Sequence, residues 1–312
     1  AIAAKSPVSV AECLLALLAL VAALRCAAGL IAWLRGRAGF WRSLAALGIE
    51  LCATFGYAYF LYVLCWGGLH ARPPLAELVK LTVVEPDPAD VELLGEELLE
   101  RARRLRVGLP ENEAGVFRSQ REFGQTARLV AEALDGIAGE GFLTKGRVVL
   151  RAAFLSPALS ALGIAGIYSP WTGEAHVNAE LPDSSLPFAA AHEAAHARGL
   201  AREDEANFAA WLACSRSADP ELAYSATLEA LRYVRSALAS TAVTTPARGE
   251  LVENLRVERD LAAVSAFWRA KATRVTALGM RANDLYLRSQ GQAEGAASYG
   301  RLVRLLVAWN RR

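Results

Sequence analysis

The sequence contains few of the residues that mark several common protein classes. Among 312 residues there are five cysteines, four histidines and one methionine, Met280. No two cysteines form a CxxC pair, and four lie within the apolar first 67 residues, so neither a zinc ribbon nor a disulfide framework is indicated. The formal net charge is only +2, without a block of like charges, so we expect no nucleic-acid partner. Because the chain begins with Ala1 and its only methionine is Met280, we expect it to be a piece of a longer protein.

Two long apolar segments are the most prominent feature that is present. They run from about residue 9 to 34 and from about 43 to 66, and each exceeds the roughly 20 residues that cross a bilayer as a helix. A cleaved signal peptide fits poorly, because its apolar region is shorter and is not followed by a second span. We therefore predict a membrane anchor of two transmembrane helices over residues 1–68. The alternative is a helical hairpin buried in a soluble core.

Charged residues in and between these segments predict how the anchor is arranged. The short connection carries Arg35, Arg37 and Arg42, and short arginine-rich loops stay in the cytoplasm. The chain after residue 68 should therefore emerge on the extracytoplasmic side. Within the spans, Arg25 and Glu50 lie at similar depths from this connection, so they either pair across the hairpin or reach water independently.

The rest of the sequence predicts one mainly helical domain. Four prolines within residues 69–90 indicate a linker, and residues 91–312 follow as the domain. Apolar residues recur at helical spacing over most of the domain, while short β-type runs occur among glycines and prolines in its middle. The predicted order is helices at 91–107 and around 112–135, short strands within 147–179, and helices from 186 nearly to the end. This pattern indicates a mainly α fold with a small sheet.

The segment HEAAH at residues 192–196 carries the clearest chemical signal. On a helix, His192 and His196 are four residues apart and lie on one face, so both imidazoles can bind one Zn²⁺. Glu193 then points near the open metal position, where it can take a proton from the attacking water and pass it to a leaving amine. This is the physical content of the HExxH motif. The alternative is a helix with two solvated histidines and a glutamate.

The residues around this motif are typical of a helix with defined ends. Ser184 or Ser185 can cap its start, Pro187 suits its first turn, and Gly199 suits a left-handed end. A second helix restarts near Glu203. The turn at Gly199 can therefore fold the start of this second helix back against the histidines.

Zinc requires a third protein ligand, and the acidic run after the turn offers candidates. Glu203 is nearest to the turn and shares a helix face with Asn207, which could hydrogen-bond a ligating histidine. Glu205 is the alternative ligand, although it lies about 200° from Glu203 around a helix. A further interpretation is that Glu203, Asp204 and Glu205 only complement the positive start of their helix.

Other residues near the motif have weaker signals. The segment from Gly166 to Phe188 can supply an edge strand that holds an extended peptide, and we expect His176 on it to face the surface or a substrate rather than the metal. Tyr299 is a candidate for stabilising the oxyanion of the reaction, with packing on a carboxy-terminal helix as the alternative. We expect His70 and Cys214 to be structural.

The run from Ile167 to Leu212 resembles an uncharacterised bacterial family of membrane metallopeptidase-like proteins, domain-of-unknown-function family 3810. Further matches are WGGLHARPPL at 66–75, AYSATLEAL at 223–231 and GAASYGRLVRLL at 295–306. The resemblance covers nearly the whole chain and implies a zincin-like α+β metallopeptidase domain in the bacterial cytoplasmic membrane. The order of Glu203 and Asn207 is similar to the glutamate-xxx-aspartate of integral-membrane gluzincin proteases, whose first acid ligates zinc. Asn207 and the short stretch before Glu203 are departures from those patterns.

Together these observations predict a membrane-anchored, zinc-dependent peptidase with an extracytoplasmic catalytic domain. Its expected partners are a peptide or protein substrate and the lipid bilayer, and its expected cofactor is Zn²⁺. Two alternatives belong to other functional classes: a non-catalytic membrane receptor or scaffold that keeps the fold, and a zinc amidase that acts on a non-peptide amide. The presence of Glu193 argues against the first alternative, because a purely metal-binding module needs no base.

Overall fold

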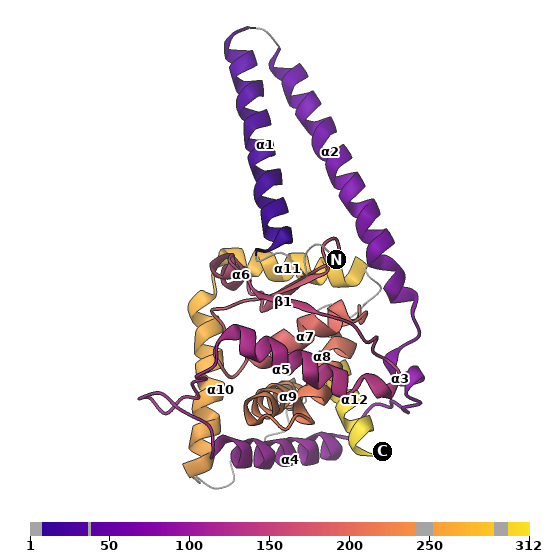
Figure 1. Cartoon of the computed structure of the whole chain (residues 1–312), viewed down its shortest axis with the longest axis vertical. Coiled ribbons are helices and arrows are strands. Elements are labelled where there is room, and N and C mark those ends of the chain that lie inside the picture. The colour runs from indigo at the N-terminus through magenta and orange to yellow at the C-terminus, as the bar shows by residue number, and fades with distance from the viewer. Residues whose placement is uncertain (1–7, 37–38, 241–251, 290–298) are drawn as a thin grey trace. The chain divides into compact units, whose positions relative to one another are not determined.

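The chain folds into two compact units. The computed structural model describes residues 8–36, 39–240, 252–289 and 299–312. The first unit comprises Ala1–Ala71 together with Ser169–Glu174, and the second comprises Arg72–Tyr168 and Ala175–Arg312. Most of the described chain is helical, with one small sheet of three strands (Figure 1).

The first unit contains two long apolar helices, α1 (Val10–Leu34) and α2 (Phe40–Cys65), followed by the 3-10 helix η2 (Gly67–Ala71). Both long helices are apolar enough to cross a membrane, and none of the residues in their most apolar windows is buried. The helices are therefore not a hairpin buried in a protein core. By length and composition they are candidate membrane spans, although a signal sequence near an N-terminus would pass the same test.

Arg25 of α1 and Glu50 of α2 form an ion pair between the two apolar helices. The distance from Arg25 Nη1 to Glu50 Oε1 is 2.6 Å, so of the two arrangements open from the sequence, pairing is the one observed. Each charge lies among apolar neighbours, where a partner lowers the cost of keeping it ionised.

Exchange of these two charges tests whether they are energetically coupled. We expect Arg25→Glu and Glu50→Arg each to lower the amount of protein in the membrane several-fold, because each places two like charges together. The double exchange restores an opposite pair and should recover most of that loss. The measurement is quantitative immunoblotting of membrane fractions for the four proteins. If the loss of protein in the double exchange equalled the sum of the losses in the two single exchanges, the two charges would not be coupled.

The first unit also includes the turn that joins two strands of the sheet. The buried carboxylate of Glu174 accepts hydrogen bonds from the backbone N–H groups of Val10 and Ala11, at 3.1 and 2.7 Å. A carboxylate at this position satisfies two unpaired donors and complements the positive end of the helix dipole. In the same turn, Trp171 lies 6.1 Å from Tyr62 of α2, measured between ring centroids.

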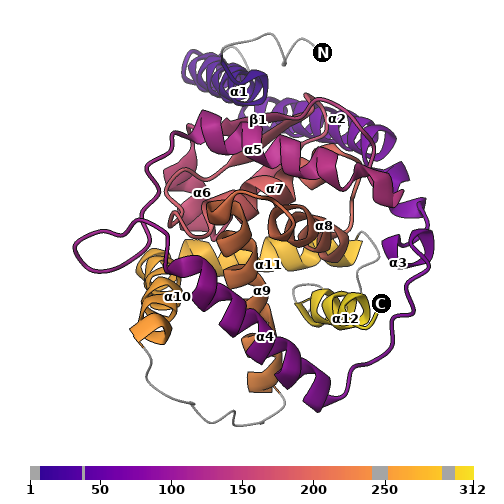
Figure 2. The ribbon, with the colours of Figure 1, turned by 60° about the horizontal axis from the view of Figure 1, so that its bottom comes forward.

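The second unit is a helical domain whose small sheet has the strand order β1-β3-β2. Helix α4 lies against α9, and α7, α8 and α9 pack on one another (Figures 1 and 2). Its elements are α3 (Leu75–Leu78), α4 (Pro88–Arg106), α5 (Phe123–Gly136), η3 (Ala138–Glu140), β1 (Val149–Ala152), α6 (Ser156–Leu162), β2 (Gly166–Ser169), β3 (Glu174–Val177), α7 (Leu186–Ala197), α8 (Glu203–Ser215), α9 (Pro220–Ser240), α10 (Val252–Lys271), α11 (Arg274–Ser289) and α12 (Tyr299–Asn310).

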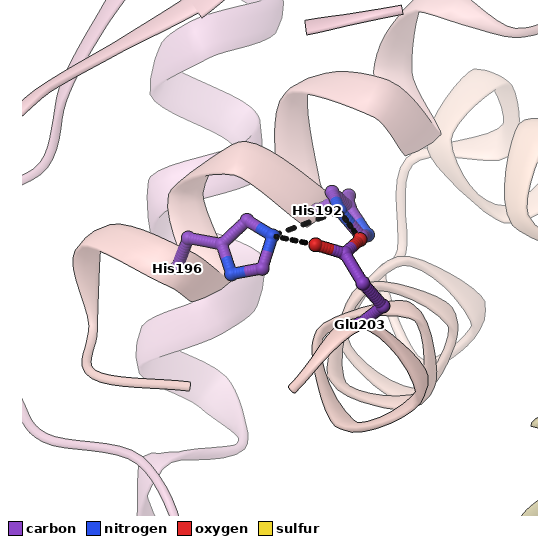
Figure 3. Close-up of side chains that lie close together, drawn as sticks. All are labelled: His192, His196 and Glu203. Atoms are coloured by element: carbon purple, nitrogen blue, oxygen red, sulfur yellow. Dashed lines mark hydrogen bonds and ion pairs between the residues drawn. The ribbon is translucent and has the colours of Figure 1, made fainter. Parts of the chain in front are cut away.

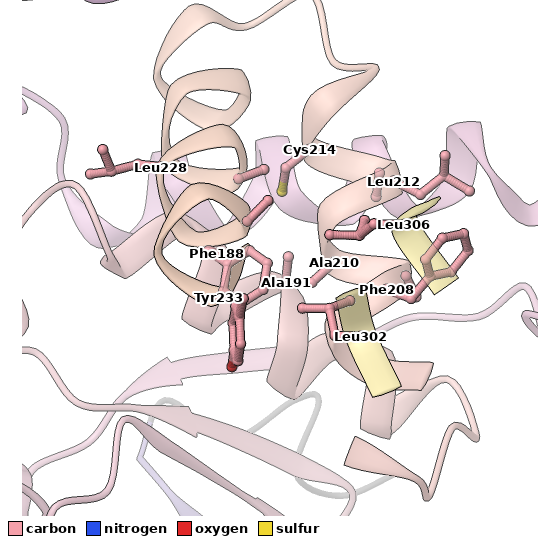
Figure 4. Packing of buried hydrophobic residues seen from close by; sticks show 14 of the residues in the cluster. Phe188, Ala191, Phe208, Ala210, Leu212, Cys214, Leu228, Tyr233, Leu302 and Leu306 are labelled. Carbon is pink, nitrogen blue, oxygen red and sulfur yellow. The ribbon is translucent and has the colours of Figure 1, made fainter. Parts of the chain in front are cut away.

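The core of this unit combines small and large apolar side chains (Figure 4). Ala191 of α7 and Ala210 of α8 have no exposed surface, and alanines allow two helices to approach closely. Larger side chains such as Phe188, Phe208 and Leu306 fill the space around them (Figure 4). Close packing of α7 against α8 holds the residues of the HEAAH motif next to the acidic start of α8.

The helix predicted around 112–135 is confirmed only from Phe123 onward, as α5, and the segment 69–90 predicted as a linker contains ordered parts. No helix covers residues 112–122: the Asn112 side chain accepts hydrogen bonds from the N–H groups of Ala114 and Val116, and Gly115 has a φ of 71°, so a turn replaces the helix. The linker is also partly built into the domain, because Leu75 at the start of α3 is completely buried. Prolines of the linker begin helices rather than only breaking them, since their fixed φ suits a first turn.

Candidate metal centre

Helix α7 carries the HEAAH motif, and a neighbouring helix helps to fix its start. Ser185 occupies the N-cap position but makes no capping hydrogen bond; its hydroxyl instead donates to Glu229 Oε1 at 2.9 Å. The hydroxyl of Ser225 on α9 accepts from the N–H of Phe188 in the first turn. The expected side-chain cap is therefore supplied from another helix, while Pro187 occupies the first turn as predicted.

The end of α7 turns the chain toward the next acidic residues. Gly199 has a φ of 94°, which is the left-handed conformation that glycine adopts without strain. Its N–H donates to the carbonyl of His196, and the N–H of Leu200 donates to that of Ala195. This is the hydrogen-bond pattern of a Schellman motif. Only a few residues later, α8 begins at Glu203, beside the histidines of α7.

Three side chains converge at this point: His192, His196 and Glu203 (Figure 3). The Nε2 atoms of the two histidines are 3.0 Å apart. The Glu203 carboxylate lies 3.2 Å from His192 Nε2 and 3.5 Å from His196 Nε2. Ligands at 2.0–2.1 Å from a tetrahedral zinc ion are about 3.3 Å apart. The two histidine nitrogens and the nearer Glu203 oxygen at each of them, Oε2 at His192 and Oε1 at His196, are therefore close to the spacing of a tetrahedral metal site.

The protonation of the His196 ring also suits a metal ligand. Its Nδ1–H donates to the carbonyl of Leu200 at 2.6 Å, which leaves Nε2 as the nitrogen with a lone pair toward the cluster. Nδ1 of His192 is buried and has no hydrogen-bond partner among the described residues. The hydrogen bond to a histidine ring that was expected from Asn207 is thus made by the Leu200 carbonyl at His196, and Nδ1 of His192 has none among the described residues.

Burial and the attraction between opposite charges have opposing effects on the pKa values of Glu203 and His196. Burial disfavours the charged form of both Glu203 and His196, but their mutual attraction outweighs it. The pKa of Glu203 is lowered, and that of His196 is raised to about 9. For Glu193, burial is the largest effect and raises the pKa, opposed by the two histidines. The ligand carboxylate is therefore kept ionised, while the neighbouring one is shifted toward the range of a general base.

The other acids at the start of α8 have different partners. Glu205 is almost fully buried, and its Oε1 accepts from the N–H of Leu75 at 2.8 Å and from Arg202 at 3.0 Å. Asp204 pairs with Arg301 at 3.7 Å. The structure thus brings Glu203, and not Glu205, to the two histidines. Glu205 instead fixes α3 to α8.

Glu193 is buried beside strand β2, where the backbone passes it closely. A Cβ added to Gly166 would lie 2.6 Å from Glu193 Cγ, 2.7 Å from its Oε1 and 2.8 Å from the carbonyl oxygen of His176. Only glycine fits this position. Gly166 is not among the residues predicted for the site, although an isolated glycine in a strand is a known sign of close backbone approach.

Gly166→Ala should therefore displace Glu193 while leaving the three candidate ligands in place. If Glu193 is the base, a displacement of about 1 Å can lower turnover on the order of 10²-fold. We would measure turnover and zinc content of the purified variant. Gly173→Ala is unsuitable as a control because its φ is positive, whereas Gly124→Ala meets no neighbouring atom and should keep full activity. Unchanged turnover of Gly166→Ala would contradict the placement of Glu193.

The remaining predicted residues lie elsewhere or outside the described part. His176 is on β3, the middle strand rather than an edge strand, and is buried, so its expected exposure was wrong. Cys214 is buried, which raises its thiol pKa to about 12 and fits a structural role. Tyr299 begins α12, but its side chain lies outside the described residues.

A family model described as "Protein of unknown function (DUF3810)" matches residues 1–307. The chain belongs to the DUF3810 family. Comparisons with curated proteins and with solved structures gave no match. The match includes both apolar helices and nearly the whole second unit, so both units belong to one family architecture. What this DUF3810 protein does must be argued from its own site.

Proposed function

We propose that this DUF3810 protein is a membrane-anchored zinc peptidase of the gluzincin type. The observation that carries the proposal is the donor triangle of His192, His196 and Glu203. The two Nε2 atoms are 3.0 Å apart, and one carboxylate oxygen lies 3.2 Å from His192 and the other 3.5 Å from His196. A buried glutamate, Glu193, is next to His192 in the chain. The donor set of two histidines and one carboxylate is that of catalytic zinc sites, which keep a fourth position open.

Each residue has a distinct task in this mechanism. Bound zinc would supply a Lewis acid that activates a water molecule for attack on a peptide carbonyl. The Leu200 carbonyl fixes the ring of His196 through Nδ1, and the negative charge of Glu203 balances part of the metal charge. Glu193 accepts a proton from the attacking water and delivers it to the leaving amine. Its raised pKa brings it closer to the value that suits both steps.

The edge position of β2 supports an extended peptide as the substrate. β2 is an outer strand of the sheet, and its Gly166 lies against Glu193. A peptide that pairs with an outer strand is held through its backbone, independently of its side-chain sequence. Such a peptide along β2 would present its carbonyl groups near Glu193. We further propose that the domain has a zincin-like fold, because strand β2, helix α7 with the HEAAH motif and helix α8 with Glu203 meet at this site.

We also propose that α1 and α2 cross the bacterial cytoplasmic membrane, with the second unit outside. Arg35 directly follows α1 and Arg42 lies in the first turn of α2, and short connections rich in arginine are retained in the cytoplasm. Labelling of single cysteines in intact cells tests this orientation. A cysteine at exposed Glu96 of α4 should react with an impermeant maleimide, whereas one at Arg35 should react only after lysis. The reverse pattern would overturn the orientation.

The proposed activity is tested by zinc content and peptide cleavage of the purified full chain. We expect about one zinc ion per chain and cleavage of unstructured peptides from a mixed library, read by mass spectrometry. Zinc without cleavage of any peptide or amide would favour a receptor or scaffold. Cleavage restricted to non-peptide amides would favour an amidase, and a chain purified without zinc that also fails to bind added zinc would end the proposal.

Zinc affinity should depend on pH in a defined direction. In the metal-free site the pKa of His196 is raised to about 9, so this histidine is protonated at neutral pH and must lose a proton to bind zinc. Affinity should therefore rise roughly tenfold per pH unit from pH 7 toward 9 and level off above it. Competition titration with a chelating indicator, corrected for the indicator's own protonation, measures this slope. A flat profile between these pH values would contradict the coupling of His196 to Glu203.

A further inference from the structure

Helix α11 presents an exposed apolar face. Val275, Leu278 and Leu285 are 51%, 66% and 69% exposed. At about 100° per residue these side chains lie on one side of the helix. The opposite side packs on α6: Thr276 Oγ1 donates to the Ala161 carbonyl at 2.8 Å, and a Cβ at Gly279 would lie 2.5 Å from the Leu162 carbonyl oxygen. This close packing fixes which face of α11 points outward.

A row of arginines borders the apolar face. Arg274, Arg281 and Arg288 are spaced by seven residues and are all exposed, so they follow one edge of the helix. One acid, Asp284, pairs with Arg288 at 2.8 Å. The described charges of α11 therefore remain predominantly positive. An apolar stripe beside a row of basic residues is typical of helices that lie in the interface of an anionic membrane.

The apolar surface continues beyond α11. Phe154 is 85% exposed, the highest exposure of any large hydrophobic residue in the described chain, and Leu155 is 43% exposed. Both directly precede α6, the helix on which α11 packs, and α6 and α11 lie together in Figure 1. Large apolar side chains this exposed are costly in water unless another phase or partner covers them.

We propose that α11 and the turn at Phe154 and Leu155 bind the surface of an anionic lipid bilayer. The apolar side chains enter the boundary of the acyl chains, and the arginines contact lipid phosphates. The second unit starts at Arg72, seven residues after α2 ends at Cys65. The proposed anchor therefore keeps the domain permanently close to such a surface. The inference rests on the membrane anchor but not on the peptidase activity.

This contact would restrict where the domain acts. A helix in the interface plane holds the domain against the bilayer at a second point besides the six residues that connect it to α2. Substrates would then be met within the layer of water next to the membrane. Together with the proposed peptidase activity, on which this one step does rest, the arrangement favours an extended peptide that is itself attached to, or emerging from, the bilayer.

The test uses the full chain in lipid vesicles with a nitroxide spin label at Leu278→Cys. The four exposed cysteines, Cys13, Cys26, Cys52 and Cys65, are first replaced by alanine, while Cys214 is buried and is left unchanged. Collisions with oxygen report a lipid environment, and collisions with a nickel chelate report water. A label at Glu96→Cys on α4 is the control, because this position is exposed and α4 lies at the other end of the domain from α11 (Figure 1).

We expect the ratio of oxygen to nickel accessibility at position 278 to be several-fold higher than at position 96. It should be higher in vesicles with phosphatidylglycerol than in pure phosphatidylcholine. The triple change Arg274→Gln, Arg281→Gln and Arg288→Gln should abolish that lipid dependence. A label at 278 as accessible to nickel as the control would overturn the proposal. A label shielded from both reagents would also overturn it, in favour of a second copy or another protein as the partner.

Discussion

Glu193→Gln is expected to keep zinc bound while lowering peptide hydrolysis by roughly 10²- to 10⁴-fold, the usual contribution of a general acid–base group. Glutamine has the same shape, so it fits beside Gly166, but its amide cannot accept the proton of the attacking water. The three candidate ligands are untouched. Because burial raises the pKa of Glu193, a neutral amide should also leave the melting temperature unchanged or slightly higher. Turnover, zinc content and melting temperature of the purified variant are the three measurements.

A matched control is available in the same domain. Glu221 of α9 is also a buried glutamate but lies outside the site. Its carboxylate accepts a hydrogen bond from the Ser119 hydroxyl at 2.6 Å. Glu221→Gln should retain the wild-type rate. If Glu193→Gln hydrolysed a substrate as fast as the wild type, Glu193 could not be the base. If it lost zinc together with activity, its role would be structural rather than chemical.

Glu203→Gln is expected to weaken zinc binding by more than the 10- to 100-fold that is typical when a residue that only hydrogen-bonds a metal ligand is changed. The substitution removes the charge that balances the metal, and an amide oxygen is a poorer zinc ligand than a carboxylate. It also removes the main cause of the raised pKa of His196. We would measure the zinc dissociation constant by chelator competition at pH 8, with circular dichroism to check the fold.

Glu205→Gln is the matched control for this change. Its amide oxygen can still accept the hydrogen bond from the Leu75 N–H, so the fold should persist, and its carboxylate takes no part in the donor triangle. Zinc affinity should therefore change little. Tight zinc in the Glu203 variant with depleted zinc in the Glu205 variant would transfer the ligand role to Glu205.

Local signals in the sequence were sufficient to locate the candidate site. Spacing by four residues on a helix places His192 and His196 together whatever surrounds them. A glycine that ends a helix determines the direction of the following turn, which is why Glu203 could be selected over Glu205. The two apolar helices and the three short strands follow equally from periodicity and length. In each case the controlling interactions lie within a few residues of one another.

The features that could not be predicted depend on distant parts of the chain. Gly166 fits Glu193 only because strand and helix meet in the folded domain. The cap of α7 comes from Ser225 on α9 rather than from the serines that precede the helix. Leu75 is buried, and its N–H donates to the Glu205 carboxylate, although the prolines around it resemble those of a free linker. Sequence periodicity carries no information about such tertiary partners.

The bond between Glu174 and the start of α1 has a consequence for the order in which the protein is made. Its carboxylate is 163 residues away from Ala11 in the chain. During synthesis, α1 therefore leaves the ribosome long before Glu174 exists. Only the Ser9 side chain, which accepts from the N–H of Glu12, caps the helix at first, and the N–H groups of Val10 and Ala11 must find water in the meantime. Only when the turn between β2 and β3 has been translated and folded can the first helix acquire its final partner. Completion of the first unit thus waits for a turn that is made together with the second.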